Sequence, residues 1–323
     1  TAPGIASAKN FGLIGVYVLE PAEPLPPMTQ EDLEFERFQI KAVSAIEEEL
    51  DRILKTRKQS RIQTIADMVI RNYGHLDEKI NFYQNLRSLE DYVSRHSLNV
   101  AILCAMITHV MNIRREEQYH TVCAALLHDM GKLKKHEDVY FGAPYSREDA
   151  IRNCETQEEA YSVIEDAFAT EGPAIRRICQ QAAGKQLDLF PEEGKESRYK
   201  MLEGSNVLLV ANRYDEITAM TLQGTAQSEV KAAQELLEHP EVYDPETVQA
   251  LLRSINILPP GASVELSTGE KALVLSENEE NVLRPTVVSF RDNSILNLAL
   301  PQNEDIQIVD VMKTMDNRYI LKK

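Results

Sequence analysis

The sequence of 323 residues has no tryptophan, few aromatic residues and only four cysteines. The cysteines, Cys104, Cys123, Cys154 and Cys179, are far apart and form no CxxC motif. A disulfide framework is therefore not indicated. All four lie in apolar segments of helical character, which predicts buried free thiols in a reducing cytoplasm.

Long apolar runs are also lacking. The longest, from Phe11 to Leu19, has nine residues including its glycines, whereas a membrane-spanning helix needs about 20. We expect no membrane span. The chain opens at Thr1 without a methionine or a signal peptide, which suggests that an upstream part is missing.

Positive charge is scarce, because the chain has 35 Lys and Arg residues against 51 Asp and Glu residues, which gives a net charge of −16. Such a chain lacks the basic field that drives general binding to nucleic acid or to membrane surfaces, so no nucleic-acid partner is expected. A small anion in a local basic pocket stays compatible with this charge. Arg176, Arg177 and Lys185 are the candidates for that pocket, and a solvated helix face is the alternative.

The spacing of apolar residues predicts a mainly α-helical protein. From about 60 to 258 these residues recur at helical intervals without the alternation of strands. After Pro259-Pro260-Gly261, short β-branched runs separated by turn residues predict a small antiparallel β module. The expected parts are residues 1–29 (the remnant of a β module with a Pro-rich linker), 30–85 (a helical extension), 86–258 (a helical bundle) and 259–323 (the β-rich module).

A helix is expected from about Thr29 to Leu54. Its apolar residues lie three, four and three positions apart and form a narrow seam; they are Val43, Ile46, Leu50 and Ile53. This seam either packs against the rest of the same domain or forms a homodimer.

One pair of segments contains residues that could bind a metal. His128 and Asp129 close an apolar helix and are followed by Gly131, a natural C′ residue, and by Lys132. His96 lies at the start of the preceding helix. Imidazole nitrogen and carboxylate oxygen together suit zinc, iron or manganese, and the lysine could contact a phosphate oxygen. The alternative is an ion pair at a helix end beside a core histidine.

The motifs RHSLNVAIL, ALLHDMGKL, LLVANRYDEIT and EVYDPETVQALL occur in that order. They resemble the HD superfamily of metal-dependent phosphohydrolases, and specifically its HD-GYP branch. The N-terminal KNFGLIGVYV is similar to the end of a module that often precedes such domains. The C-terminal PPGASVELSTGEKALV is similar to a β tail of some relatives. The resemblance implies an HD-domain helical bundle.

Complete HD-GYP domains bind two or three metal ions, often iron, and hydrolyse the bacterial messenger cyclic di-GMP. By this resemblance His96, His128 and Asp129 are metal ligands, and Lys132 is the lysine of the HDxGK motif. Asn212 stands where the family has its closing aspartate. Gln180-Gln181 replaces a histidine pair, Leu189-Phe190-Pro191 replaces Gly-Tyr-Pro, and residues 137–180 contain no histidine.

These departures favour a degenerate HD-GYP-type domain in bacterial cyclic-dinucleotide signalling, catalytically impaired and acting as a regulatory or interaction module. The expected cofactor is either none or a single weakly bound divalent ion (iron, manganese or zinc). A cyclic dinucleotide and a signalling protein such as a GGDEF-type domain are the expected partners. The alternatives are an active phosphodiesterase-like hydrolase with a reduced metal site and a purely structural interaction protein.

Overall fold

The computed structural model describes residues 30–82, 84, 86–134, 146–190, 200–221 and 226–312. The strand and Pro-rich linker that the sequence predicts before residue 30 lie outside these ranges. Within them, residues 36–312 form one compact unit.

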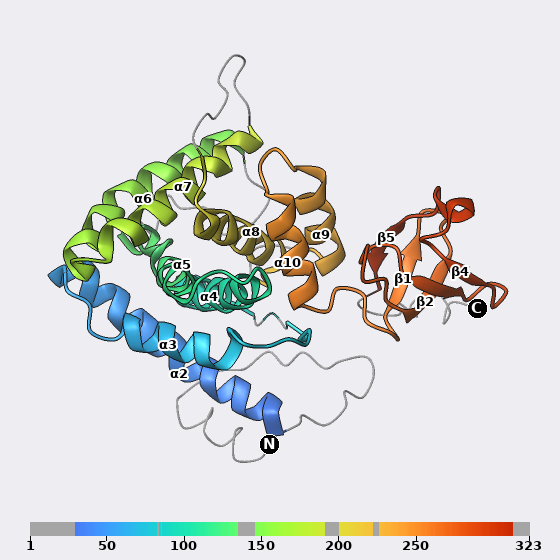
Figure 1. Cartoon of the computed structure of the whole chain (residues 1–323), viewed down its shortest axis with the longest axis horizontal. Coiled ribbons are helices and arrows are strands. Elements are labelled where there is room, and N and C mark those ends of the chain that lie inside the picture. Colours follow the sequence, from blue (N-terminus) through green and yellow to red (C-terminus); the bar gives the residue numbers. More distant parts are fainter. Residues whose placement is uncertain are drawn as a thin grey trace, which may run out of the picture. The chain divides into compact units, whose positions relative to one another are not determined.

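Helices dominate the described residues, as predicted (Figure 1). They are α2 (Gln30–Thr56), α3 (Ile62–Tyr73), α4 (Tyr92–Val110), α5 (Arg115–Leu127), α6 (Arg147–Phe168), α7 (Gly172–Gln186), α8 (Glu203–Thr218), α9 (Glu229–Glu238) and α10 (Pro245–Ser254), with short 3₁₀ helices η1 (Met130–Lys134) and η2 (Leu187–Leu189).

Helix α4 is the central element of the bundle. Nearly all of its 19 residues are buried, including polar residues in its first turns. It packs against α3, α5, α8 and α10. Helix α8 is buried over almost its whole length as well, and it contacts α5, α7 and α9 besides α4. The polar residues of α4 and α8 are therefore brought together in the interior.

Helix α2 agrees with the helix expected from about Thr29 to Leu54. Its seam residues Val43, Ile46, Leu50 and Ile53 are buried within the single chain, which supports packing against the same domain. The buried carboxylate of Glu49 accepts hydrogen bonds from the backbone N–H groups of Ser60 and Arg61 at the start of α3. Homodimerisation through α2 stays a prediction.

Gly131 does not end a helix in the way that the sequence predicts. It lies inside η1, and the only glycines with positive φ among the described residues are Gly261 and Gly269, so the predicted C′ role is wrong. A Cβ at Gly131 would lie 2.6 Å from the side-chain oxygen of Gln157 and 2.6 Å from the backbone oxygen of Thr156. Close packing against α6 requires the glycine here, rather than helix termination.

The C-terminal module is an antiparallel sheet with strand order β4-β3-β2-β1-β5. Its strands are β1 (Ser263–Leu266), β2 (Lys271–Ser276), β3 (Thr286–Ser289), β4 (Ile295–Asn297) and β5 (Ile308–Val311). The first four match the predicted runs, and β5 was not predicted. Gly269, with φ +78°, supplies the turn between β1 and β2, where other residues would be strained.

The four cysteines are free thiols, of which Cys104, Cys123 and Cys179 are buried and Cys154 is partly buried. Burial raises the pKa of Cys154 to about 11 and that of Cys123 to about 12, so these thiols are unreactive at neutral pH. Among the described residues, no helix combines the length and the apolar character that a membrane span requires.

Candidate metal centre

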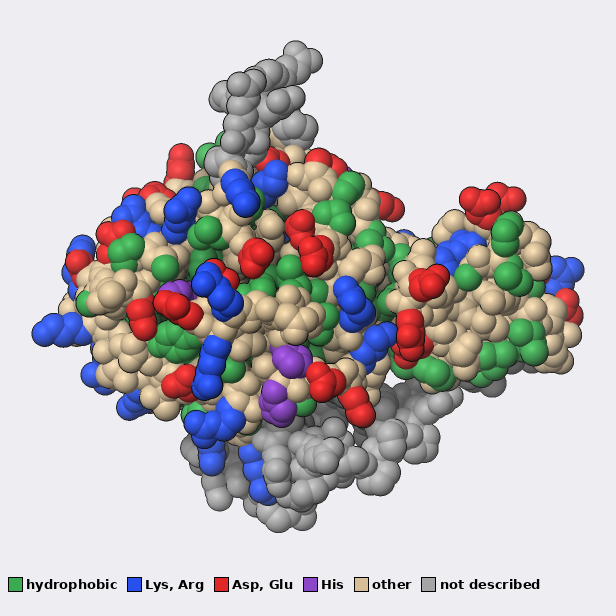
Figure 2. Space-filling model, viewed as in Figure 1, with side chains coloured by type: hydrophobic (Ala, Val, Ile, Leu, Met, Phe, Trp, Pro, Cys, Tyr) green, Lys and Arg blue, Asp and Glu red, His purple; other side chains and the backbone are tan. Residues whose placement is uncertain are grey.

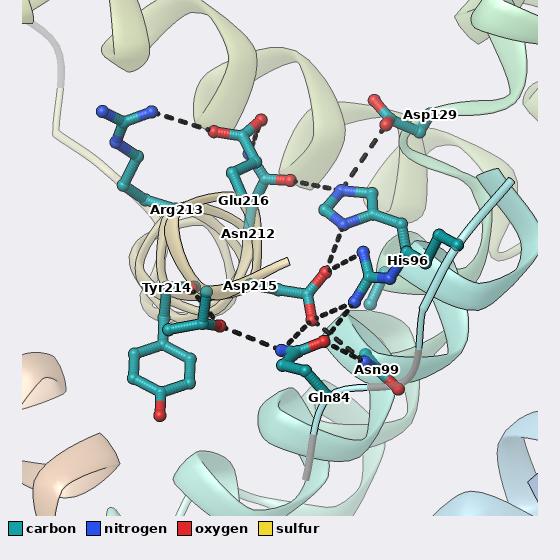
Figure 3. Close-up of polar contacts among 12 residues, drawn as sticks. Gln84, His96, Asn99, Asp129, Asn212, Arg213, Tyr214, Asp215 and Glu216 are labelled. Atoms are coloured by element: carbon teal, nitrogen blue, oxygen red, sulfur yellow. Dashed lines mark hydrogen bonds and ion pairs between the residues drawn. The ribbon is translucent and has the colours of Figure 1, made fainter. Parts of the chain in front are cut away.

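The structure brings His96, His128 and Asp129 together in the interior. His96 comes from α4, and the other two follow the last residue of α5. All three are buried, and one ligand atom from each lies within 4.8 Å of the others. The Nε2 atoms of the two histidines are 3.2 Å apart. His96 Nε2 is 3.5 Å from Asp129 Oδ2, a contact drawn in Figure 3. Residues 32 positions apart in the chain thus converge on one point.

Asn212 on α8 completes this group. Its side-chain oxygen Oδ1 lies 2.9 Å from His96 Nε2 and 2.9 Å from His128 Nε2. The residue expected at the position of the closing aspartate therefore faces the two histidines. We call His96, His128, Asp129 and Asn212 the metal cluster.

Hydrogen bonds on the outer side of the cluster fix the orientation of its donors. His96 Nδ1 donates to Asp215 Oδ2 at 2.6 Å, and His128 Nδ1 donates to the backbone oxygen of Ala125 at 2.8 Å. Burial lowers the pKa of His128, which keeps its ring neutral. With the hydrogen on Nδ1, the Nε2 atom of a neutral imidazole carries a lone pair.

The amide of Asn212 is oriented in the same way. Its Nδ2 donates to Glu216 Oε1 at 3.1 Å, so its Oδ1 must face the histidines. Glu216 is held in turn by Arg213 and Gln186. The lone pairs of Asn212 Oδ1, His96 Nε2 and His128 Nε2 thus point at one another across 2.9–3.2 Å.

Lone pairs that converge in a buried site are held together by positive charge between them, either a proton or a metal ion. Two imidazole nitrogens, a carboxylate and an amide oxygen form a donor set suited to zinc, iron or manganese. The separations are those of neighbouring ligands around one ion with bonds of about 2.0–2.2 Å. The residues present therefore fit a single divalent cation.

Asp129 carries the only carboxylate of the metal cluster. Lys132 Nζ donates to its Oδ2 at 2.7 Å, and Gln157 Nε2 donates to its Oδ1 at 3.1 Å. Burial acts to raise the pKa of Asp129, but the lysine and the two histidines outweigh it and lower the pKa to about 2. Lys132 is itself buried. The predicted phosphate-binding lysine contacts the metal cluster instead of an open surface.

A small cavity borders the cluster. It has a volume of about 20 Å³ and is lined by residues that include Asn153, Gln157, Ala182 and Ala183, together with His128, Asp129 and Asn212. This volume holds one water molecule or one ion. Pockets for drug-sized ligands measure hundreds of Å³, so the cavity formed by the described residues does not accommodate a dinucleotide.

The structure places Gln180 and Gln181 away from this cavity, although the sequence interpretation set them in the place of a metal-binding histidine pair. Gln180 donates to Glu158, and Gln181 accepts hydrogen bonds from Leu202 N and Ser205 Oγ. Ala182 and Ala183 face the cavity in their stead. These alanines have no side-chain donor for a metal.

The three basic residues proposed for anion binding do not form one pocket. Arg176 pairs with Glu158 and Glu165 on α6, and Lys185 pairs with Asp188. Arg177 lines an open groove of about 600 Å³ that also contains Arg114 and Lys200. Figure 2 shows acidic and basic side chains interspersed over the described part of the face in view.

Sequence reasoning missed a second buried group, which we call the Asp215 cluster: Asp215, Arg87, Gln84 and Asn99. Both oxygens of Asp215 accept from the Arg87 guanidinium at 2.7 Å. Asn99 and Gln84 donate to Asp215 Oδ1 at 3.0 and 2.9 Å. These contacts and His96 hold the pKa of Asp215 far below its usual range despite burial. The available signal was its spacing, three residues after Asn212 on one helix face.

Comparison with known families places residues 93–220 in the HD domain. No curated protein and no solved structure matches the chain. The match supports the HD superfamily of metal-dependent phosphohydrolases for these residues, which comprise less than half of the chain. It confirms this part of the sequence-based resemblance, whereas the HD-GYP branch stays a prediction.

Proposed function

We propose that this chain is a degenerate HD module that holds a single divalent metal ion and acts as a regulatory or interaction module rather than as a diesterase. The observation that carries the proposal is the convergence of two imidazole Nε2 atoms and an amide oxygen beside a cavity of only about 20 Å³. The donors favour a cation, and the small cavity disfavours a substrate.

The ligand set supports one ion rather than two. A two-metal centre needs a second group of ligands about 3.5–4 Å from the first ion. On α7 the residues that line the cavity are Cys179, Ala182, Ala183 and Gln186. Among the described residues, His96, His128 and Asp129 form the one group of three or more His, Cys, Asp or Glu side chains that could hold a metal. Without a second ion, a phosphodiester transition state loses stabilisation of about 3–4 kcal/mol for each missing electrostatic contact.

Within this proposal each side chain has a defined task. His96, His128 and Asp129 would hold the ion, and Asn212 would supply a neutral fourth oxygen. Lys132 offsets the charge of Asp129 at 2.7 Å. A bound ion of this kind can polarise a water molecule or a phosphoryl oxygen. The resemblance suggests cyclic-dinucleotide signalling as the setting, with a GGDEF-type domain as the candidate partner and iron, manganese or zinc as the ion.

Metal analysis and a diesterase assay test the proposal together. We expect protein purified without chelator to bind up to one equivalent of Mn²⁺ or Zn²⁺ in calorimetry, and to leave cyclic di-GMP and a generic aryl diester intact. His128→Ala should abolish metal binding. His239→Ala is the matched control, because His239 is partly exposed and its side chain pairs with Glu241, away from the metal cluster.

The alternative is an active single-metal phosphohydrolase, and the retention of His96, His128, Asp129 and Lys132 together favours it. Hydrolysis at an ordinary enzymatic rate that is lost in His128→Ala and kept in His239→Ala would replace our proposal with this alternative. Absence of any metal uptake by the unchanged protein would remove both.

A further inference from the structure

The Asp215 cluster contacts the metal cluster at one atom, Nδ1 of His96. Asp215 is completely buried, and its Oδ2 receives the Nδ1 hydrogen at 2.6 Å. The opposite ring nitrogen of His96 is the one that faces His128 and Asn212. Any change in which nitrogen of His96 carries the hydrogen therefore changes the metal cluster directly (Figure 3).

Arg87 and Gln84 come from the segment before α4, outside the region that matches the HD domain. The Arg87 backbone N–H donates to Met220 O at 2.8 Å, which ties this segment to the end of α8. The guanidinium carbon of Arg87 lies 5.4 Å from the centre of the Tyr92 ring. The Tyr92 ring in turn stacks on His96, with centroids 5.5 Å apart. Arg87 is thus connected to His96 through two intermediate side chains, the carboxylate of Asp215 and the ring of Tyr92.

We propose that Asp215 is a positioning residue that keeps the Nε2 lone pair of His96 directed at the metal, and that Arg87 holds Asp215 in place from outside the HD domain. This inference rests on the proposed function. Outer hydrogen-bond partners of this kind fix the tautomer and the ring orientation of metal-binding histidines.

The hydrogen-bond inventory shows why a neutral amide cannot replace Asp215. Oδ1 accepts from Arg87, Gln84 and Asn99, and Oδ2 accepts from Arg87 and His96. In Asp215→Asn the single amide oxygen satisfies the larger group of donors, which turns the NH₂ toward His96 Nδ1. The hydrogen of His96 then moves to Nε2, where it blocks the metal.

The test uses the whole chain with Asp215→Asn and a matched control, Glu49→Gln. Both variants neutralise a buried carboxylate, and Glu49 binds the start of α3 rather than the metal cluster. Nitrogen-15 NMR of chelator-treated protein reports which His96 nitrogen is protonated. Calorimetry with Mn²⁺ and Zn²⁺ reports affinity. For Asp215→Asn we expect a switch of the His96 tautomer and affinity lower by about ten- to a hundredfold. Glu49→Gln should keep both properties.

The two readouts separate the inference from the proposed function. If the unchanged protein binds no metal, the proposed function fails, and the NMR spectrum alone decides whether Asp215 sets the tautomer. If the unchanged protein binds metal and Asp215→Asn shows the same affinity and the same tautomer, the inference is overturned. Should Asp215→Asn fail to fold, Arg87→Met/Asp215→Leu removes both charges together. Unaltered metal affinity in that double variant would also overturn the inference.

Discussion

The metal cluster and the Asp215 cluster are two polar groups buried side by side, and they share the ring of His96. In the Asp215 cluster, donors face acceptors: one carboxylate receives hydrogen bonds from a guanidinium, two amides and an imidazole. In the metal cluster, two imidazole nitrogens and an amide oxygen face one another, and Lys132 donates to the carboxylate of Asp129. The first group is complete within the protein, whereas the second requires a positive charge between its members, which either a proton or a metal ion can supply.

This difference separates a structural role from a binding role. Buried polar groups that are fully paired stabilise a unique interior arrangement, whereas unpaired ones lower stability. The Asp215 cluster should therefore matter for folding whether or not metal is present. Under the proposed function, the metal cluster would matter for folding mainly through a bound ion, because a ligand that binds only the native state adds stability.

The largest expected effect comes from Arg87→Met. The substitution leaves the Asp215 carboxylate buried without its main counter-charge, which costs about 3–5 kcal/mol in free energy of unfolding. Chemical denaturation in the presence of a chelator measures this loss. Arg61→Met is the control, because Arg61 pairs with Glu48 at the surface, where a pair contributes less than about 1 kcal/mol. Equal losses in both variants would contradict a special role for the Asp215 cluster.

A smaller effect is expected from Asn212→Asp. A second carboxylate beside the ion adds a charge and should raise affinity for Mn²⁺ or Zn²⁺ at least about tenfold, equivalent to about 1.4 kcal/mol. Without metal the added charge repels the buried carboxylate of Glu216, whose Oε1 lies 3.1 Å from Nδ2 of Asn212, so chelator-treated protein should melt at a lower temperature. Calorimetry and thermal unfolding measure the two effects.

Asn206→Asp is the control for Asn212→Asp, since Asn206 lies on the same helix but does not line the cavity at the metal cluster. It should leave metal affinity unchanged. An unaltered affinity in Asn212→Asp itself would show that the oxygen of residue 212 does not contact the ion.

The smallest expected effect is a pH dependence that belongs to His128. Burial lowers the pKa of His128 below the ordinary 6.5, so below that pH the unfolded chain binds a proton that the folded chain does not. Folding stability is therefore greatest above about 6.5 and falls as the pH drops toward the lowered value, by at most about 1.4 kcal/mol per pH unit. Denaturation of chelator-treated protein between about pH 7.5 and 5.5 should show a steeper decline for the unchanged chain than for His128→Ala. Identical slopes would contradict this assignment.

The sequence predicts most of the fold because its signals are local. Apolar spacing identifies the helices, and Pro259-Pro260-Gly261 separates them from the β-branched strands. Strand β5 was missed because a four-residue strand shows its identity only through pairing with β1. Gly131 was misinterpreted because its neighbours Thr156 and Gln157 lie on another helix.

The candidate site likewise contains residues that local motifs identify and residues that only the tertiary structure reveals. His96, His128, Asp129 and Asn212 could be selected from short motifs, and the structure brings them together. Arg87 could not be selected, because it lies 128 residues from Asp215 and an isolated arginine in a sequence is usually exposed. The true surroundings of Gln180 and Gln181 also depend on how α7 is rotated toward α6 and α8, which a motif does not specify.

The segment that carries Arg87 has one further consequence. It joins α3 to α4 and is attached along its length through backbone hydrogen bonds of Ile80 with Ser254 and Asn256, and of Arg87 with Met220. If its placement governs how tightly the ion is held, thermodynamic reciprocity applies: metal binding must strengthen the attachment of this segment by the same free energy. A partner that binds the N-terminal helices and a metal ion held by His96, His128 and Asp129 would then be coupled ligands, each altering the affinity of the protein for the other.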